Sequence, residues 1–114
     1  MSGRARSVTD RATFASLRSS RHRGRSGPLG VAYVPGGSSD APRVAYAVGR
    51  WVGNAVARNR VRRRLRAAVE TMAGNLPAGA YLITAGADAC DLPFDQLRAQ
   101  LWKAIQTATG TNPG

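Results

Sequence analysis

The sequence has few of the residues and segments on which cross-linking and membrane insertion depend. Cys90 is the only cysteine, so the chain forms no internal disulfide and suits a reducing cytosol. No apolar run approaches the length that spans a bilayer, and no apolar segment follows the arginine-rich N-terminus to make a secretory signal. These absences predict a cytoplasmic protein with no membrane partner.

Acidic residues are also scarce, and the basic residues are concentrated in one part of the chain. The formal net charge is +11 at pH 7, and every basic residue except Lys103 is an arginine. Residues 1–66 hold fifteen arginines against Asp10 and Asp40, a net charge of +13, whereas residues 67–114 carry −2. Such a distribution is typical of a protein that binds a polyanion. An anionic membrane surface is a weaker candidate, because the basic helix described below also has an apolar stripe.

Hydrophobic periodicity predicts one α+β domain, an α-β sandwich in which three helices pack on a small mixed sheet, in the order α-β-β-α-β-α. The predicted strands are 29–34, 43–49 and 80–85, and the predicted helices run from a Ser or Thr cap near Ser7 to 19, from 54 to 72 and from 94 to 108. Residues 21–27 fit a loop or a frayed edge strand, and 35–42 a turn-rich connector. We expect a disordered basic arm at 1–6, the domain at 7–109 and a flexible tail at 110–114.

The helix predicted over residues 54–72 carries the strongest functional signal. Its apolar stripe repeats at three- and four-residue spacing through Asn54, Ala57, Val61, Leu65, Ala68 and Met72. Six arginines fall within nine residues on its other faces: Arg58, Arg60, Arg62, Arg63, Arg64 and Arg66. Like charges one turn apart repel, and Glu70, which could pair with Arg63 or Arg66, is the only acid on this helix. A nucleic-acid backbone would supply the missing counter-charge and release counterions.

Three polar residues near the start of this helix are further candidate RNA contacts. The helix begins directly after a strand, so its free N–H groups would form an anion site beside Arg50, although Asn54 is more simply a helix cap. Asn59 is a poor helix former whose amide suits a base edge or a 2′-hydroxyl, and a tolerated surface residue is the equal alternative.

The composition gives little support to unaided RNA cleavage. A metal-dependent nuclease needs converging carboxylates, but Pro93 interrupts the aspartates of residues 88–95, which helix capping explains more simply. His22 is the only histidine, so the chain lacks a histidine acid–base pair. We therefore expect no catalytic residue, no metal ligand and no small-molecule substrate.

Residues 52–66 resemble the signature of the bacterial ribonuclease P protein component, a Gly-x-Ala-Val-x-Arg-Asn-Arg core with a basic helical continuation. The core stands here, without a gap, as Gly53-Asn54-Ala55-Val56-Ala57-Arg58-Asn59-Arg60. The resemblance extends more loosely over about residues 7–108. It implies a protein subunit that helps a catalytic RNA remove the 5′ leader of precursor tRNA, with Mg²⁺ bound mainly by the RNA. A structural RNA binder such as a ribosomal protein is the alternative.

The resemblance also implies roles for individual residues. Catalytic-RNA contacts are implied for the Arg-Asn-Arg helix, from Arg58 to Arg66. With the two candidates at the helix start, the expected RNA-binding set is Arg50, Asn54, Arg58, Asn59, Arg60, Arg62, Arg63, Arg64 and Arg66. A cleft between the first helix and the sheet would hold the leader, with Phe14 and Tyr33 at matching positions and Arg18 where many members have a second aromatic residue. Trp51 replaces a cation and either stacks on a base or packs, and Tyr46 is assigned to the core. The family's crossover around this helix is left-handed, where the general rule predicts a right-handed one.

Overall fold

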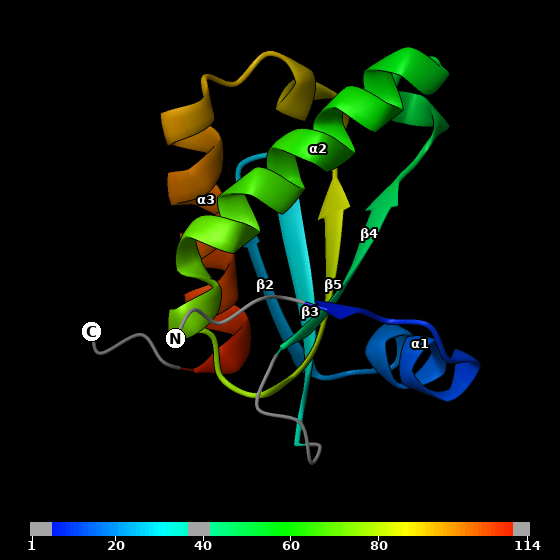
Figure 1. The fold of residues 1–114 in the computed structure, drawn as a ribbon, viewed down its shortest axis with the longest axis vertical. Coiled ribbons are helices and arrows are strands. Elements are labelled where there is room, and N and C mark those ends of the chain that lie inside the picture. Colours follow the sequence, from blue (N-terminus) through cyan, green and yellow to red (C-terminus); the bar gives the residue numbers. More distant parts are fainter. Residues whose placement is uncertain (1–5, 37–41, 111–114) are drawn as a thin grey trace.

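The computed structural model describes residues 6–36 and 42–110, and it shows a mixed β-sheet with helices on both faces (Figure 1). Across the sheet the strands are β1 (Arg6–Ser7), β4 (Arg43–Val48), β5 (Gly79–Ala85), β3 (Leu29–Pro35) and β2 (His22–Ser26). Strand β4 runs parallel to β1 and β5, whereas β3 runs antiparallel to β5 and β2. The helices are α1 (Arg11–Arg18), α2 (Ala55–Met72) and α3 (Phe94–Thr109), with 3-10 turns η1 (Arg50–Val52), η2 (Ala73–Asn75) and η3 (Ala87–Cys90). The predicted α+β class is confirmed.

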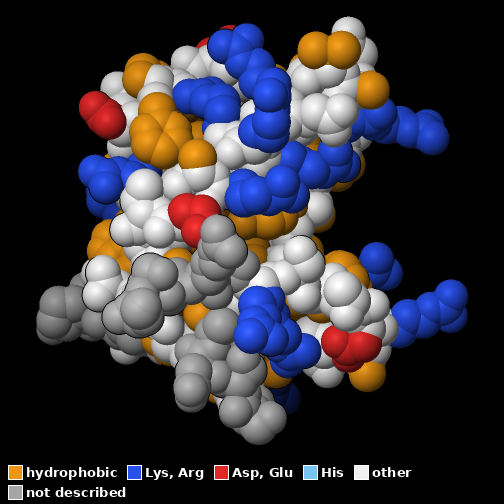
Figure 2. Space-filling view, in the orientation of Figure 1, with side chains coloured by type: hydrophobic (Ala, Val, Ile, Leu, Met, Phe, Trp, Pro, Cys, Tyr) orange, Lys and Arg blue, Asp and Glu red, His pale blue; other side chains and the backbone are white. Residues whose placement is uncertain are grey.

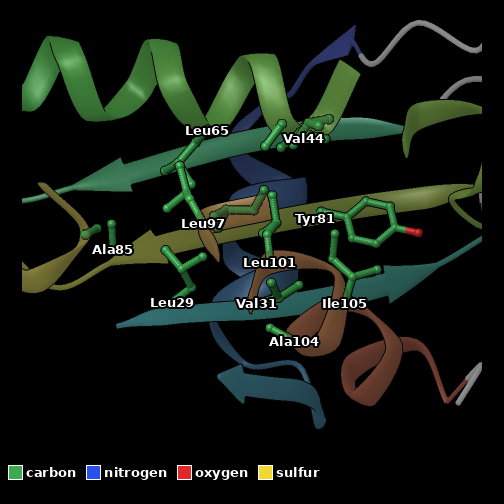
Figure 3. Packing of buried hydrophobic residues seen from close by; sticks show 14 of the residues in the cluster. Leu29, Val31, Val44, Leu65, Tyr81, Ala85, Leu97, Leu101, Ala104 and Ile105 are labelled. Atoms are coloured by element: carbon green, nitrogen blue, oxygen red, sulfur yellow. The ribbon is translucent and has the colours of Figure 1, made fainter. Parts of the chain in front are cut away.

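The main core lies between one face of the sheet and helices α2 and α3 (Figure 3). Leu65 of α2 and Leu101 and Ile105 of α3 are at most 1% exposed and pack with Leu29 and Tyr81 of the sheet. A smaller cluster on the opposite face joins Val8 and Leu17 to three alanines of the central strands, Ala32, Ala45 and Ala80. Helix α1 contacts only β3 and β5 closely, so it covers part of its face.

The structure changes the predicted start of the first helix. Asp10, and not Ser7, is the cap of α1, because its carboxylate accepts a hydrogen bond of 2.9 Å from the Thr13 N–H. Ser7 belongs with Arg6 to β1, so Arg6 is not part of a disordered arm. The rest of that predicted arm, residues 37–41 of the connector and residues 111–114 of the tail lie outside the described residues.

Strand β2 settles the alternative left open for residues 21–27. Its polar sequence pairs with β3 along its whole length, and α3 lies directly against it. Gly24 permits this approach, since a Cβ there would lie 2.1 Å from the Ala104 carbonyl oxygen. The edge strand is therefore held by backbone pairing and a close helix contact, with little apolar side-chain burial of its own.

Helix α2 connects the neighbouring parallel strands β4 and β5 and ends within a residue of its predicted bounds. Asn54 caps it by accepting a hydrogen bond of 2.9 Å from the Ala57 N–H, and Gly53 precedes the cap with φ of +146°, a conformation that favours glycine. The left-handedness of this crossover stays a prediction. Within the described residues, no helix is long and apolar enough to span a bilayer.

Candidate RNA-binding surfaces

Helix α2 presents an arginine-rich face that has no acidic partner among the described residues. The helix is anchored in the main core by its buried side, Val61, Leu65, Ala68, Val69 and Met72, and most of its other side chains reach the surface. Blue basic side chains gather along the line of α2 in Figure 2. Among residues 6–36 and 42–110 the one ion pair is Arg43 with Asp10 at 3.5 Å, so neither Glu70 nor any other described acid pairs with an arginine of α2. The predicted unpaired charge is therefore present on the described surface.

A shallow groove of about 440 Å³ runs along the outer side of this helix, lined by Val56, Asn59, Arg62, Arg63 and Arg66. Arg62 donates a hydrogen bond of 2.9 Å to the Asn59 side-chain oxygen, which fixes both side chains at the groove. The Asn59 amide nitrogen has no hydrogen-bond partner among the described residues and can donate to a ligand. Arg58 and Arg60 lie on the same helix, half-buried and exposed respectively. These residues form a surface that suits phosphates and a polar base or ribose edge.

Arg66 is the one groove arginine with an aromatic neighbour. Its guanidinium carbon lies 5.8 Å from the centre of the Tyr46 ring, within the range of a cation–π interaction. Tyr46 packs against the main core, as predicted, and burial raises the pKa of its hydroxyl to about 12. The ring therefore stays neutral and orients Arg66 on the surface of α2.

Arg64 corrects the expected RNA-binding set. Its guanidinium is half-buried and donates hydrogen bonds to the carbonyl oxygens of Ala89 and Cys90, each at 3.3 Å, and to that of Leu92. These carbonyl groups belong to η3 and to the loop before α3. No helix continues beyond η3 there, so no helical N–H group acts as the donor to these oxygens. Arg64 therefore ties this loop to α2, and its donors are turned into the protein and away from a ligand.

Of the two candidate residues at the start of α2, one makes a contact within the protein and one is exposed. The Asn54 side-chain oxygen is occupied as the helix cap, which is the simpler of its two predicted roles, whereas Arg50 is exposed in η1. Contact of either residue with RNA stays a prediction.

A second basic surface lies on the other face of the sheet, beside α1. Arg11, Phe14, Ala15 and Arg18 line a hollow of about 680 Å³ on α1. Phe14 is partly buried and packs against the smaller cluster. An aromatic ring and two arginines thus share one exposed helix surface.

Beyond α1, the uncovered part of this face forms a neighbouring hollow of about 350 Å³ whose floor includes Gly30, Ala32 and Thr84. Arg25 extends from the edge strand at its rim. Arg23 also borders it, but its guanidinium donates to carbonyls at and just after the C-terminus of α1, including that of Leu17 at 3.3 Å and that of Ser20 at 2.9 Å. The small side chains leave room for a ligand to approach the sheet.

Tyr33 does not belong to this surface, which corrects its predicted place in the cleft. It shares with Val31 the opposite face of β3, where it is 6% exposed and its ring centre lies 4.9 Å from that of Tyr81. Its hydroxyl donates a hydrogen bond of 2.9 Å to the Ala78 carbonyl. Tyr33 is a core residue.

Arg11 and Arg25 were not among the residues predicted for the surface beside α1. Arg11 lies one helical turn before Phe14, and strand alternation from Arg23 would have located Arg25.

Comparisons with known proteins agree on one family. The Ribonuclease P family model matches residues 3–109. The ribonuclease P protein component of Thermobifida fusca is 38% identical over 107 residues, which cover 87% of this chain and 73% of that protein. The Brucella suis component is 44% identical over 75 residues, 64% of this chain, and the match spans about half of that relative, 52%.

Solved structures show the same fold. A mutant RNase P protein from Staphylococcus aureus superposes with a TM-score of 0.79 at 22% identity, over 90% of this chain and 86% of that one. The RNase P protein from Thermotoga maritima gives a TM-score of 0.70 at 19% identity, over 88% of this chain and 94% of that one.

Proposed function

The chain belongs to the ribonuclease P protein family, and from this premise we propose that it is the protein component of a ribonuclease P, an endoribonuclease that matures the 5′ end of tRNA. In this proposal α2 binds the catalytic RNA, and the surface beside α1 holds the 5′ leader of precursor tRNA. The observation that carries it is the set of α2 arginines without an acidic partner among the described residues.

The electrostatics of α2 favour a phosphate backbone as its ligand. Arg58, Arg60, Arg62, Arg63 and Arg66 remain after Arg64 is assigned to the loop. Each arginine that meets a phosphate releases counterions, and each contact contributes about 0.7–0.9 to the slope of log affinity against log salt. The Asn59 amide beside Arg62 adds a neutral donor, which suits a ribose hydroxyl or a base edge.

The surface beside α1 suits a single strand. Unpaired bases stack on aromatic side chains while arginines follow the backbone, and Phe14 lies between Arg11 and Arg18 on one exposed helix. The floor of Gly30 and Ala32 lets the strand lie close to the sheet. Because these contacts do not read a base pattern, the surface would accept leaders of different sequence.

The cleavage chemistry in this proposal belongs to the RNA. The described residues contain no group of three or more histidine, cysteine or acidic side chains that could hold a metal ion. The proposal assigns the Mg²⁺ of the reaction mainly to the catalytic RNA and derives no protein step through it. The protein would act in the cytoplasm as a binding and positioning subunit.

Reconstitution tests the proposal. The chain is added to the ribonuclease P RNA of the same genome with precursor tRNA at low Mg²⁺, and removal of the 5′ leader is followed on a gel. We expect the protein to restore cleavage, because its arginines replace part of the Mg²⁺ that screens the phosphates. The double variant Arg62→Ala/Arg63→Ala should require more protein, whereas Lys103→Ala, which removes an exposed cation from α3, should match the wild type. RNA binding without any stimulation would instead indicate a structural RNA binder.

A further inference from the structure

Trp51 lies exposed but fixed at the start of the arginine-rich helix. It belongs to η1, which joins β4 to α2, and 65% of its surface is exposed. Its indole N–H donates a hydrogen bond of 2.8 Å to the Ala85 carbonyl at the end of β5. The six-membered ring lies over Gly49, where a Cβ would be 2.1 Å from two ring atoms. The indole is thus held at its nitrogen edge and against backbone, and most of it faces solvent.

Core packing does not account for this arrangement. Burial of a large apolar side chain stabilises a fold in proportion to the area removed from water, and Trp51 leaves about two thirds of its area in water. Trp102, the other tryptophan, packs against the main core, whereas Trp51 belongs to neither core cluster. The ring is therefore positioned by specific contacts without contributing the burial that such a residue usually provides.

We propose that Trp51 is a stacking platform for an unpaired nucleobase of the RNA that α2 binds. The ring is already immobilised by Ala85 and Gly49, so a base that stacks on it loses little of the protein's side-chain entropy. Arg50, exposed in the same turn, supplies a cation for the adjoining phosphate. Aromatic stacking accepts any base, so Trp51 adds affinity without sequence preference. This inference rests on the proposed function, because it takes the α2-bound RNA as its ligand.

Tryptophan fluorescence and binding measurements test the stacking directly. Trp102→Phe leaves Trp51 as the sole tryptophan, and its emission is followed during titration with the ribonuclease P RNA of the same genome. We expect strong quenching at saturation, since a stacked base is in van der Waals contact with the indole. In parallel, affinity is measured by filter binding for Trp51→Leu, which keeps apolar volume without a π-face, and for Trp51→Phe, which keeps a ring without the N–H.

Loss of one stacked base corresponds to roughly a 5- to 150-fold loss of affinity, which we expect for Trp51→Leu. Trp51→Phe should retain most of the affinity, and neither variant should change the salt slope, because tryptophan carries no charge. Trp102→Phe should bind as the wild type does.

Two outcomes would overturn the inference, and they differ in whether the proposed function fails as well. In the first outcome the RNA binds in a salt-dependent way, but Trp51 emission is not quenched and Trp51→Leu binds with unchanged affinity. This result would refute stacking and leave the proposed function intact. Quenching of Trp51 by an added protein, and not by the RNA, would have the same meaning. A wild-type chain that binds no ribonuclease P RNA would refute both. Should Trp51→Leu fail to fold, the fluorescence titration still decides, because it uses the native Trp51.

Discussion

Replacing Arg64 and Arg60 by alanine should separate structure from RNA binding on the same helix. The two residues are one turn apart in α2, and both lie in residues 52–66, which resemble the ribonuclease P signature. Arg64 donates to three loop carbonyls, whereas Arg60 is exposed and makes no side-chain hydrogen bond or ion pair among the described residues. We expect Arg64→Ala to destabilise the fold and Arg60→Ala to weaken RNA binding.

The magnitude follows from the hydrogen bonds that are lost. A hydrogen bond from a charged donor contributes about 1.5–3 kcal/mol, but water can reach part of this half-buried site and replace some of them. We therefore expect Arg64→Ala to lower the free energy of unfolding by about 2–3 kcal/mol, or a melting temperature lower by roughly 10 °C. Arg60→Ala removes an exposed side chain and should change stability by less than about 0.5 kcal/mol.

Thermal melting by circular dichroism and RNA affinity at several salt concentrations provide the two readouts. Arg60→Ala should lower the salt slope by about one, whereas Arg64→Ala should keep the wild-type slope at a temperature where it is folded. Arg64→Lys should be intermediate in stability, because an ammonium group cannot span three carbonyls. An Arg64→Ala protein that melts with the wild type and loses one unit of slope would show that Arg64 contacts a phosphate after all.

Three further variants test other parts of the structure. Phe14→Ala should weaken binding of precursor tRNA more than that of mature tRNA in gel shifts, and equal losses would make Phe14 a core residue only. Gly24→Ala should lower urea stability by about 1–3 kcal/mol through the clash with the Ala104 carbonyl, and wild-type stability would show that α3 moves aside. The hydrogen bonds from Thr13 lower the pKa of Asp10, so its stabilisation is present above the ordinary value of 3.8 and fades as pH falls through the lowered pKa. Acid titration of stability should therefore be flatter below pH 3.8 for Asp10→Ala than for the wild type.

Periodicity was sufficient to predict the helices and the three central strands, because each carries an apolar pattern long enough to define its period. It could not assign the two faces of the sheet. Neighbouring residues such as Tyr33 and Val34 point to opposite faces of the strand, but the pattern does not say which face meets α1. Only the packing of α3 against β2 and β3 shows that Tyr33 faces away from α1. The cleft position of Tyr33 was wrong for this reason, whereas Phe14 shares its surface with Arg11 and Arg18.

The roles of individual arginines depended on segments distant in sequence. A helical wheel places Arg64 outside the apolar stripe, but it cannot show that the loop at 89–92 returns to that side of α2. Ser7 pairs with Val44 of β4, far along the chain, and α1 begins after Asp10, a pairing that the local pattern around the first helix does not show. Helix α2 itself needed no such context, since Asn54 and its apolar stripe specify both its start and its orientation.

The position of β5 has a consequence for synthesis of the chain. Strands β3 and β4 do not pair with each other; β5 lies between them, and its residues 79–85 come after α2. During translation the two halves of the sheet therefore remain unjoined until β5 has left the ribosome, and such late, long-range pairing is slow. All the α2 arginines emerge first, so the nascent polypeptide is strongly cationic, beside ribosomal RNA, before it has a completed sheet to support them.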